Sequence, residues 1–350
     1  MQVLVTGATG LIGSHVVKAL VAQKHKVKAL VRPESNSSHL PLDKIELCKG
    51  DLFSPESLIT AAKGCQVIYH TAGVFSYWGY SGEQFIREAK QGIENIIRAA
   101  AHQKIKRIVF TSSSVTIGAT EKQEILSEGH PGNFDEAPAY VIAKKEQEET
   151  AFAIGKKTGV EVIAICPALT IGGPDHHLTE SNRMIVNYLK DPYKATWIGG
   201  CNLVNVRDVA DAMLLLAERG KAGERYIAGS DNMSWQEVHQ LISSLCGLPG
   251  PYITALRTSS YLLSAVQELW SHFTKERPAS TIEQAKMVGK YYWYSSEKLK
   301  RLGYNPGSSE EALVETLSWL VTSNHIPGSL RSAMKLSDAI YSFRNQQQPV

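Results

Sequence analysis

Val5-Thr6-Gly7-Ala8-Thr9-Gly10-Leu11-Ile12-Gly13 joins a β-rich run to an amphipathic helical pattern over residues 12–22. Gly7 allows a tight turn, Gly10 lets the backbone approach a ligand, and Gly13 lets the helix pack closely on the strand. The helix N-terminus that follows favours phosphate. The stretch therefore predicts the phosphate-binding turn of a dinucleotide site. Its predicted cofactor contacts are Gly7, Thr9, Gly10, Leu11, Ile12 and Gly13.

Short β-rich runs alternate with longer amphipathic stretches through the first half of the chain. The strand-like runs are residues 2–6, 26–31, 45–47, 66–69, 107–110 and 161–165. The longest helical patterns cover residues 82–103 and 140–157. This alternation predicts a parallel sheet with helices on both faces, which binds ligands beyond the carboxyl ends of its strands.

The second half of the chain is predicted to be mostly helical. Residues 203–206 and 225–228 still have the pattern of strands, and we expect them to extend the same sheet. The predicted fold class is α/β, a Rossmann-type doubly wound parallel sheet with a smaller, mostly helical C-terminal substrate lobe. The expected division is residues 1–170 plus 203–230 for the dinucleotide-binding domain and 171–202 plus 231–330 for the substrate lobe. Residues 331–350 form a C-terminal tail with a polar, frayed end from Arg344.

Composition excludes several classes of function. The chain has 37 Lys and Arg against 34 Asp and Glu, and the basic residues are scattered, which argues against a nucleic-acid surface. Five widely spaced cysteines lack metal-ligand spacing, so we expect free thiols, no metal site and a cytoplasmic location. The apolar stretch 252–273 is interrupted by Arg257, Gln267 and Glu268, and we therefore expect no membrane span.

Two further patterns indicate acid–base chemistry. In Tyr140-Val-Ile-Ala-Lys144 the i,i+4 spacing places a phenol and an ammonium on one helix face. A nearby cation lowers a tyrosine pKa. In Thr111-Ser112-Ser113-Ser114 a hydroxyl follows an apolar run and so lies at the carboxyl end of a strand. Each pattern alone is also typical of a solvated helix face or a simple turn.

Together these motifs resemble the extended short-chain dehydrogenase/reductase family. The family order is matched by the glycine turn, Gly50-Asp51-Leu52, His70-Thr71-Ala72-Gly73, Ser113 and Tyr140/Lys144. The resemblance extends to about Trp319. It is nearest to dihydroflavonol reductase-like and hopanoid-associated epimerase-like members.

The resemblance implies a role for each matching residue. Ser113 would hydrogen-bond the substrate oxygen, Tyr140 would exchange a proton with it, and Lys144 would lower the tyrosine pKa and hold the nicotinamide ribose. Ala89 stands where many members have the asparagine of a proton relay, so we do not expect that relay here. The other implied cofactor contacts are Asp51, Leu52, Thr71, Ala72, Gly73 and Pro167.

The choice of cofactor depends on the end of the second strand. Arg32 stands there instead of the acidic residue that would bind a free ribose 2′-hydroxyl. A guanidinium matches a 2′-phosphate in charge and geometry. NADP(H) is therefore the preferred cofactor, with NAD(H) as the alternative. Phe75, Tyr77 and Trp78, which follow the fourth strand, are expected to wall the substrate site.

The expected function is hydride transfer between NAD(P)(H) and a ketone/alcohol or aldehyde/alcohol pair. One alternative is a nucleotide-sugar epimerase or dehydratase with tightly held NAD, and another is a non-catalytic redox sensor that binds dinucleotide. The intact trio of Ser113, Tyr140 and Lys144 favours an enzyme. Asn202 stands close to where sugar-nucleotide members have an arginine, but Arg183 and Arg207 keep the epimerase alternative open.

The partners expected are few. A small carbonyl or alcohol substrate is the main one, and no nucleic acid is expected. A homodimer would form through the helices predicted at residues 82–103 and 140–157, by resemblance to the family.

Overall fold

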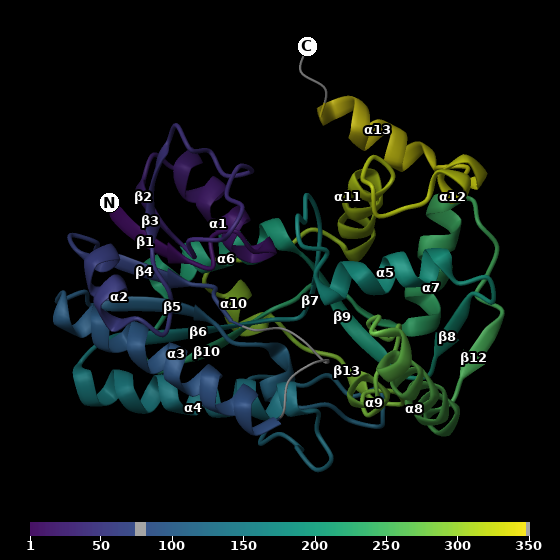
Figure 1. Ribbon diagram of the computed structural model, residues 1–350, viewed down its shortest axis with the longest axis horizontal. Helices are drawn as coiled ribbons and strands as arrows, with labels where there is room; N and C mark the ends of the chain where they lie inside the picture. Colours follow the sequence, from purple (N-terminus) through teal and green to yellow (C-terminus); the bar gives the residue numbers. More distant parts are fainter. Residues whose placement is uncertain (74–81, 348–350) are drawn as a thin grey trace.

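The computed structural model describes residues 1–73 and 82–347. Its large sheet is parallel throughout, with strand order β10-β6-β5-β4-β1-β2-β3 (Figure 1). The order reverses between β1 and β4, which is the switch point at which such sheets bind ligands. The strands are β1 (Gln2–Thr6), β2 (Lys26–Val31), β3 (Ile45–Lys49), β4 (Val67–His70), β5 (Arg107–Thr111), β6 (Glu161–Pro167) and β10 (Arg225–Ala228). The predicted fold class is confirmed.

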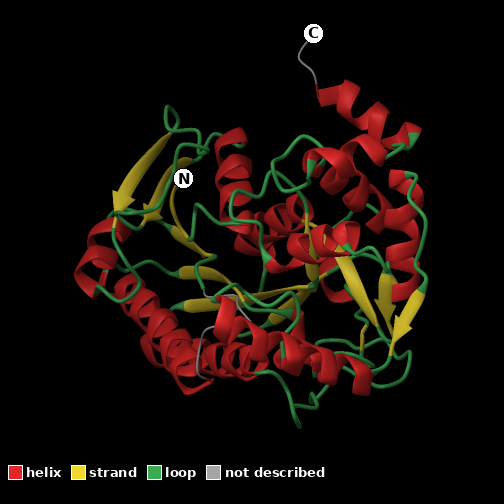
Figure 2. Ribbon diagram, turned by 45° about the vertical axis from the view of Figure 1, so that its right-hand side comes forward, coloured by secondary structure: helices red, strands yellow, loops and turns green. Residues whose placement is uncertain are grey.

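Helices cover both faces of the large sheet (Figure 2). α1 (Leu11–Ala22) and α6 (Val206–Arg219) share one core with Val3 and Val5 of β1. The opposite core takes Leu4 together with α2 (Pro55–Ala62), α3 (Gly82–His102) and α4 (Ala139–Thr158). Successive residues of one strand therefore enter different cores, as the period of two requires.

The strand expected at residues 203–206 does not join the large sheet. As β9 (Gly200–Asn205) it pairs with β7 (Leu169–Ile171), β11 (Asn232–Ser234) and β13 (Tyr291–Tyr292) in a separate four-stranded sheet. The physical reason lies in its alternating side chains, because Val204 is buried in a core of the large sheet while Leu203 is buried in the core of the second lobe. That prediction was wrong, whereas the one for residues 225–228 is confirmed by β10.

The second lobe surrounds a core of its own. α5 (Glu180–Lys190), α7 (Trp235–Cys246) and α11 (Ser309–Leu320) contribute most of that core. The remaining elements are β8 (Ala195–Trp197), β12 (Ile253–Ala255), α8 (Arg257–Thr274), α9 (Ile282–Ala285), α10 (Glu297–Lys300), α12 (Gly328–Ala333) and α13 (Asp338–Gln347).

The end of the chain differs from the expectation of a frayed tail. The helix α13 continues to Gln347 and packs against α11, because Ile340 is fully buried in the lobe core. Among the described residues, no helix has both the length and the apolar character needed to cross a membrane.

Candidate active site

The turn between β1 and α1 has the geometry of a phosphate cradle. Gly7 has a φ of +69°, and a Cβ built on it would lie 2.6 Å from the backbone nitrogen of Ala72. A Cβ on Gly13 would lie 2.1 Å from the carbonyl oxygen of Gly7. No side chain caps the first turn of α1, and that turn contains no acidic residue. The exposed N–H groups and the helix dipole therefore fit the pyrophosphate of a dinucleotide.

The end of β4 is fixed beside this turn. Thr6 Oγ1 lies 2.7 Å from Nδ1 of His70, and Thr71 Oγ1 donates a hydrogen bond of 2.8 Å to the carbonyl of Thr6. Burial lowers the pKa of His70 to about 3, so its ring is neutral. A Cβ on Gly73 would lie 3.5 Å from Nζ of Lys144. The cradle and the predicted catalytic lysine thus meet at the ends of adjacent strands.

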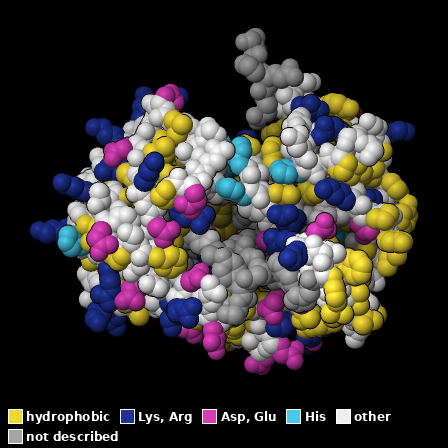
Figure 3. Space-filling view, in the orientation of Figure 1, with side chains coloured by type: hydrophobic (Ala, Val, Ile, Leu, Met, Phe, Trp, Pro, Cys, Tyr) yellow, Lys and Arg dark blue, Asp and Glu magenta, His cyan; other side chains and the backbone are white. Residues whose placement is uncertain are grey.

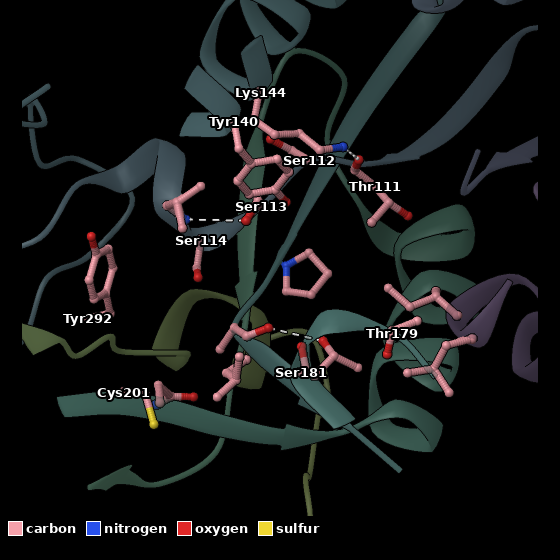
Figure 4. A pocket seen from close by; sticks show the side chains of 18 of the residues that line it. Thr111, Ser112, Ser113, Ser114, Tyr140, Lys144, Thr179, Ser181, Cys201 and Tyr292 are labelled. Carbon is pink, nitrogen blue, oxygen red and sulfur yellow. Dashed lines mark hydrogen bonds between the residues drawn. The ribbon is translucent and has the colours of Figure 1, made fainter. Parts of the chain in front are cut away.

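The structure brings Ser113, Tyr140 and Lys144 together (Figure 4). Ser113 caps the short 3-10 helix η1 (Ser114–Ile117) and is hydrogen-bonded to Tyr140, which lies in the first turn of α4. Lys144, one turn further along α4, donates to the carbonyl of Thr111 at 3.1 Å and to Oε1 of Gln147 at 3.0 Å. Two elements, η1 and α4, therefore supply the three predicted catalytic side chains.

Burial controls the protonation of this trio. It raises the pKa of Tyr140 to about 12, against a smaller opposing effect of the hydrogen bond from Ser113. It lowers the pKa of Lys144 to about 8, opposed by the negative charges of Cys166 and Glu148 in their ionised forms. Desolvation is the dominant effect on Tyr140, and the lowering of its pKa by Lys144 that the family resemblance implies stays a prediction. Tyr140 is protonated at neutral pH, which suits a proton donor.

A cavity of about 280 Å³ joins the cradle to the predicted catalytic trio. The predicted residues that line it are Gly10, Leu11, Ile12, Gly13, Thr71, Gly73, Ser113, Tyr140, Lys144 and Pro167. Sequence reasoning missed the wall contributed by the second lobe. That wall includes Thr179, Ser181, Cys201, Asn202, Trp235, Met287, Tyr292 and Tyr294. The aromatic run of residues 291–294 was the one signal in the sequence for it.

Several predicted cofactor contacts lie outside the lining of this cavity. Asp51 Oδ1 accepts a hydrogen bond of 2.8 Å from the backbone N–H of Phe53, so the carboxylate holds its own loop. Asn95 Nδ2 donates to the carbonyl of Leu52 at 2.8 Å. Arg32 follows β2 with 65% of its side chain exposed, and its Nε lies 3.4 Å from Oε1 of Glu34. The cradle itself contains Gly7 and Thr9. Ala72 lies just after the neighbouring strand β4.

The predicted substrate residues Phe75, Tyr77 and Trp78 lie outside the described residues. Their role stays a prediction.

A buried carboxylate behind the serine turn was not predicted. Glu148 Oε2 accepts hydrogen bonds from Ser112 Oγ and, at 3.1 Å, from Thr116 Oγ1. Its Oε1 lies 3.3 Å from Nη1 of Arg225, at the start of β10. Only 8% of the Glu148 side chain is exposed. Because Ser112 and Thr116 flank Ser113, this network fixes the backbone that presents the predicted catalytic hydroxyl.

Replacing Glu148 by alanine should lower the free energy of unfolding by about 2–4 kcal/mol, because it leaves two buried hydroxyls without their acceptor and removes the counter-charge of Arg225. Chemical denaturation measures the change. Glu149→Ala is the matched control, since that side chain is 59% exposed and its ion pair with Lys145 contributes at most about 1 kcal/mol. Equal stabilities of the two variants would contradict the stabilising role of the buried Glu148 carboxylate.

Comparisons with known proteins agree with this geometry. Residues 3–229 match the model of the NAD dependent epimerase/dehydratase family. The chain is 30% identical over 328 residues to a Synechocystis sp. protein named as a dihydroflavonol 4-reductase, covering 92% of this chain and 95% of that one. It is 29% identical to cinnamoyl-CoA reductase 1 of Petunia hybrida, with 93% of each chain covered.

A solved structure shows the same fold. The crystal structure of gox2253 superposes with a TM-score of 0.81 at 28% identity, covering 93% of this chain and 99% of that one. The chain therefore belongs to the NAD-dependent epimerase/dehydratase family and is an NAD(P)-dependent enzyme of the extended short-chain dehydrogenase/reductase type.

Proposed function

We propose that the protein interconverts a small, largely apolar ketone or aldehyde and its alcohol by hydride transfer, with NADP(H) as the preferred cofactor. The observation that carries the substrate class is the charge of the cavity wall. Among the described lining residues, Lys144 is the only cation. A nucleoside diphosphate requires arginine or lysine partners, commonly in bidentate geometry.

The arginines that kept the epimerase alternative open have partners outside the cavity, although the buried Nε of Arg183 has none among the described residues. Arg183 Nη2 donates to the carbonyl of Leu178 at 2.9 Å, and Arg207 Nε lies 2.9 Å from Oε1 of Glu315. Neither lines the cavity. The sequence of residues 74–81, Val-Phe-Ser-Tyr-Trp-Gly-Tyr-Ser, adds no basic residue. The relatives named as reductases also favour a carbonyl substrate over a sugar nucleotide.

The chemistry follows from the trio and the cradle. Bound NADPH supplies the hydride. Ser113 donates a hydrogen bond to the substrate oxygen, and Tyr140 delivers the proton to that oxygen. Lys144, held by Thr111 and Gln147, contributes positive charge beside the phenolate that forms.

Three broader assignments accompany this proposal. Residues 1–170 plus 203–230 form the cofactor-binding unit, and 171–202 plus 231–330 form the substrate unit. The five cysteines are free thiols, which fits the cytoplasm. A homodimer through α3 and α4 rests on the family resemblance alone, because the exposed large hydrophobic side chains of the described chain lie on other elements.

The substrate class is tested by offering two kinds of ligand to the full-length protein. In the presence of NADPH, calorimetry with UDP and UDP-glucose should show no micromolar binding, while a panel of small apolar ketones and aldehydes should include compounds that oxidise NADPH. Micromolar binding of UDP that Arg183→Ala or Arg207→Ala abolishes would establish sugar-nucleotide chemistry instead.

Tyr140→Phe should reduce turnover by about a hundredfold to ten-thousandfold and leave NADPH affinity largely intact, because it removes the general acid and keeps the ring. Single-turnover oxidation of NADPH measures the first quantity, and quenching of cofactor fluorescence measures the second. Tyr292→Phe is the control, since Tyr292 lines the same cavity. A Tyr140→Phe variant with more than about a tenth of the wild-type rate would exclude Tyr140 as the acid.

Arg32→Ala should weaken NADPH binding by about tenfold or more and leave NADH binding nearly unchanged, because only NADPH offers a 2′-phosphate. Glu34→Gln should tighten NADPH binding, since it removes the carboxylate 3.4 Å from Arg32. Titrations of both cofactors into the three proteins measure these changes. If Arg32→Ala binds NADPH as well as the wild type does, the NADP preference is wrong.

A further inference from the structure

Lys144 and Glu148 lie one turn apart on α4 and bind consecutive residues where β5 ends. Nζ of Lys144 donates to the carbonyl of Thr111 at 3.1 Å (Figure 4). Oε2 of Glu148 accepts a hydrogen bond from Oγ of Ser112, the next residue. The i,i+4 spacing places the two side chains on one helix face. An ammonium and a carboxylate are therefore held against the same short stretch of chain.

Lys144 depends on a nearby negative charge to stay protonated. Burial lowers its pKa to about 8, against the opposing charges of Cys166 and Glu148 in their ionised forms. Because this value is already close to neutrality, a further decrease would leave much of the amine uncharged at neutral pH. An uncharged Lys144 could not stabilise the phenolate of Tyr140, which is its part in the proposed function.

Three other titratable groups near Lys144 are neutral. Burial lowers the pKa of His70 to about 3, and it raises the pKa of Tyr140 to about 12. Burial, together with a smaller effect of the Glu148 charge, raises the pKa of the Cys166 thiol well above its ordinary value. Among the described residues that act on Lys144, Glu148 is therefore the only negative charge at neutral pH.

Arg225 contacts the other oxygen of the same carboxylate. Its Nη1 lies 3.3 Å from Oε1 of Glu148, while its N–H groups also donate to backbone carbonyls at 2.6 to 3.3 Å. Lys145 and Glu149, the neighbours on α4, pair with each other at 2.7 Å, and Nδ1 of His130 contacts backbone groups. The Glu148 carboxylate is therefore shared between two cations, Arg225 and the lysine of the trio.

Charges on the outer surface contribute less to the potential at this lysine. On the face of the molecule that Figure 3 shows, acidic and basic side chains are interspersed. Salt screens exposed charges beyond about 10 Å at an ionic strength of about 0.1 M. The Glu148 carboxylate is screened much less, because only 8% of its side chain is exposed. The local carboxylate is therefore the charge that matters.

The hydrogen bonds of Glu148 do not by themselves require a charge. Ser112 and Thr116 donate hydroxyl groups to it, and a neutral amide oxygen would also accept them. Burying an ionised carboxylate is costly, and a buried ion pair is weak evidence for stability. The serine turn thus accounts for the oxygen atoms of Glu148 but not for its charge.

We propose that Glu148 is a positioning residue of the active site, whose buried carboxylate is the counter-charge that keeps Lys144 protonated beside Tyr140. Glu148 does not line the cavity of the trio, so it acts through Lys144 and not on a ligand. The inference rests on the proposed function, in which the charge of Lys144 stabilises the phenolate. The two can fail separately, since the charge of Lys144 is measured without substrate or cofactor.

Trace acetylation of the full-length protein with acetic anhydride measures that charge, because only the neutral amine reacts. Mass spectrometry of the peptide that contains Lys144, over a series of pH values, gives the midpoint of its titration. We expect a midpoint near the wild-type pKa of about 8. Glu148→Gln keeps an acceptor oxygen for the serine turn and removes the charge. Its midpoint should fall by about one pH unit, because the charged amine loses its partner.

The sign of this shift separates a charge effect from a loosened structure. A serine turn that merely lost its support would admit water to Lys144 and raise the midpoint toward the ordinary lysine value. Glu148→Asp retains the charge and should have a midpoint close to that of the wild type. Glu149→Gln removes the same charge one residue along, where 59% of the side chain is exposed, and should leave the midpoint unchanged.

An unchanged or raised midpoint in Glu148→Gln would overturn the proposal, as would an equal fall in Glu148→Asp or Glu149→Gln. Thermal unfolding shows whether each variant is folded at the labelling temperature. If Glu148→Gln is not folded, Arg225→Gln takes its place. Removal of that competing cation should raise the Lys144 midpoint, and an unchanged or lower midpoint would contradict the proposal. Oxidation of NADPH by carbonyl compounds tests the proposed function separately.

Discussion

The close approach of α1 to the end of β1 is the constraint on which the remainder of the site depends. A methyl group on Gly13 would stand 2.1 Å from the carbonyl oxygen of Gly7, so only glycine permits the helix to start where it does. This contact aims the N-terminus of α1 across the switch point of the sheet. The neighbouring strand ends then fall into register, with Thr71 bonded to Thr6 and Gly73 beside Lys144.

The two lobes are held together by residues that serve both. Asn202 is buried and bonds through its amide to the carbonyl of Ser230 at 3.0 Å and to Oδ1 of Asn232 at 2.8 Å. Across the cradle, His39 stacks on His176 with ring centroids 4.1 Å apart. Burial lowers the pKa of both imidazoles, which favours the neutral rings that stacking requires.

The parts of the fold that depend on neighbouring residues could be predicted from the sequence. The cradle and the strands of the large sheet were predictable because glycine turns and periods of 2 and 3.6 are read within a few residues. The sheet to which β9 belongs could not be predicted, since the same alternating pattern suits either sheet. Only the placement of Leu203 and Val204 in different cores decides between the two sheets. Long-range contacts also hid Glu148, which looks like a solvated helix residue until residues 112 and 225 are brought beside it.

The bond between Arg225 and Glu148 also orders the events of synthesis. Arg225 begins the last strand of the large sheet, far along the chain from the serine turn that it helps to fix. While the ribosome has not yet released that strand, the carboxylate lacks its counter-charge and the sheet lacks its edge. Because Arg225 lies 77 residues beyond Glu148, the serine turn can gain this ion pair only once the chain through the start of β10 has been made.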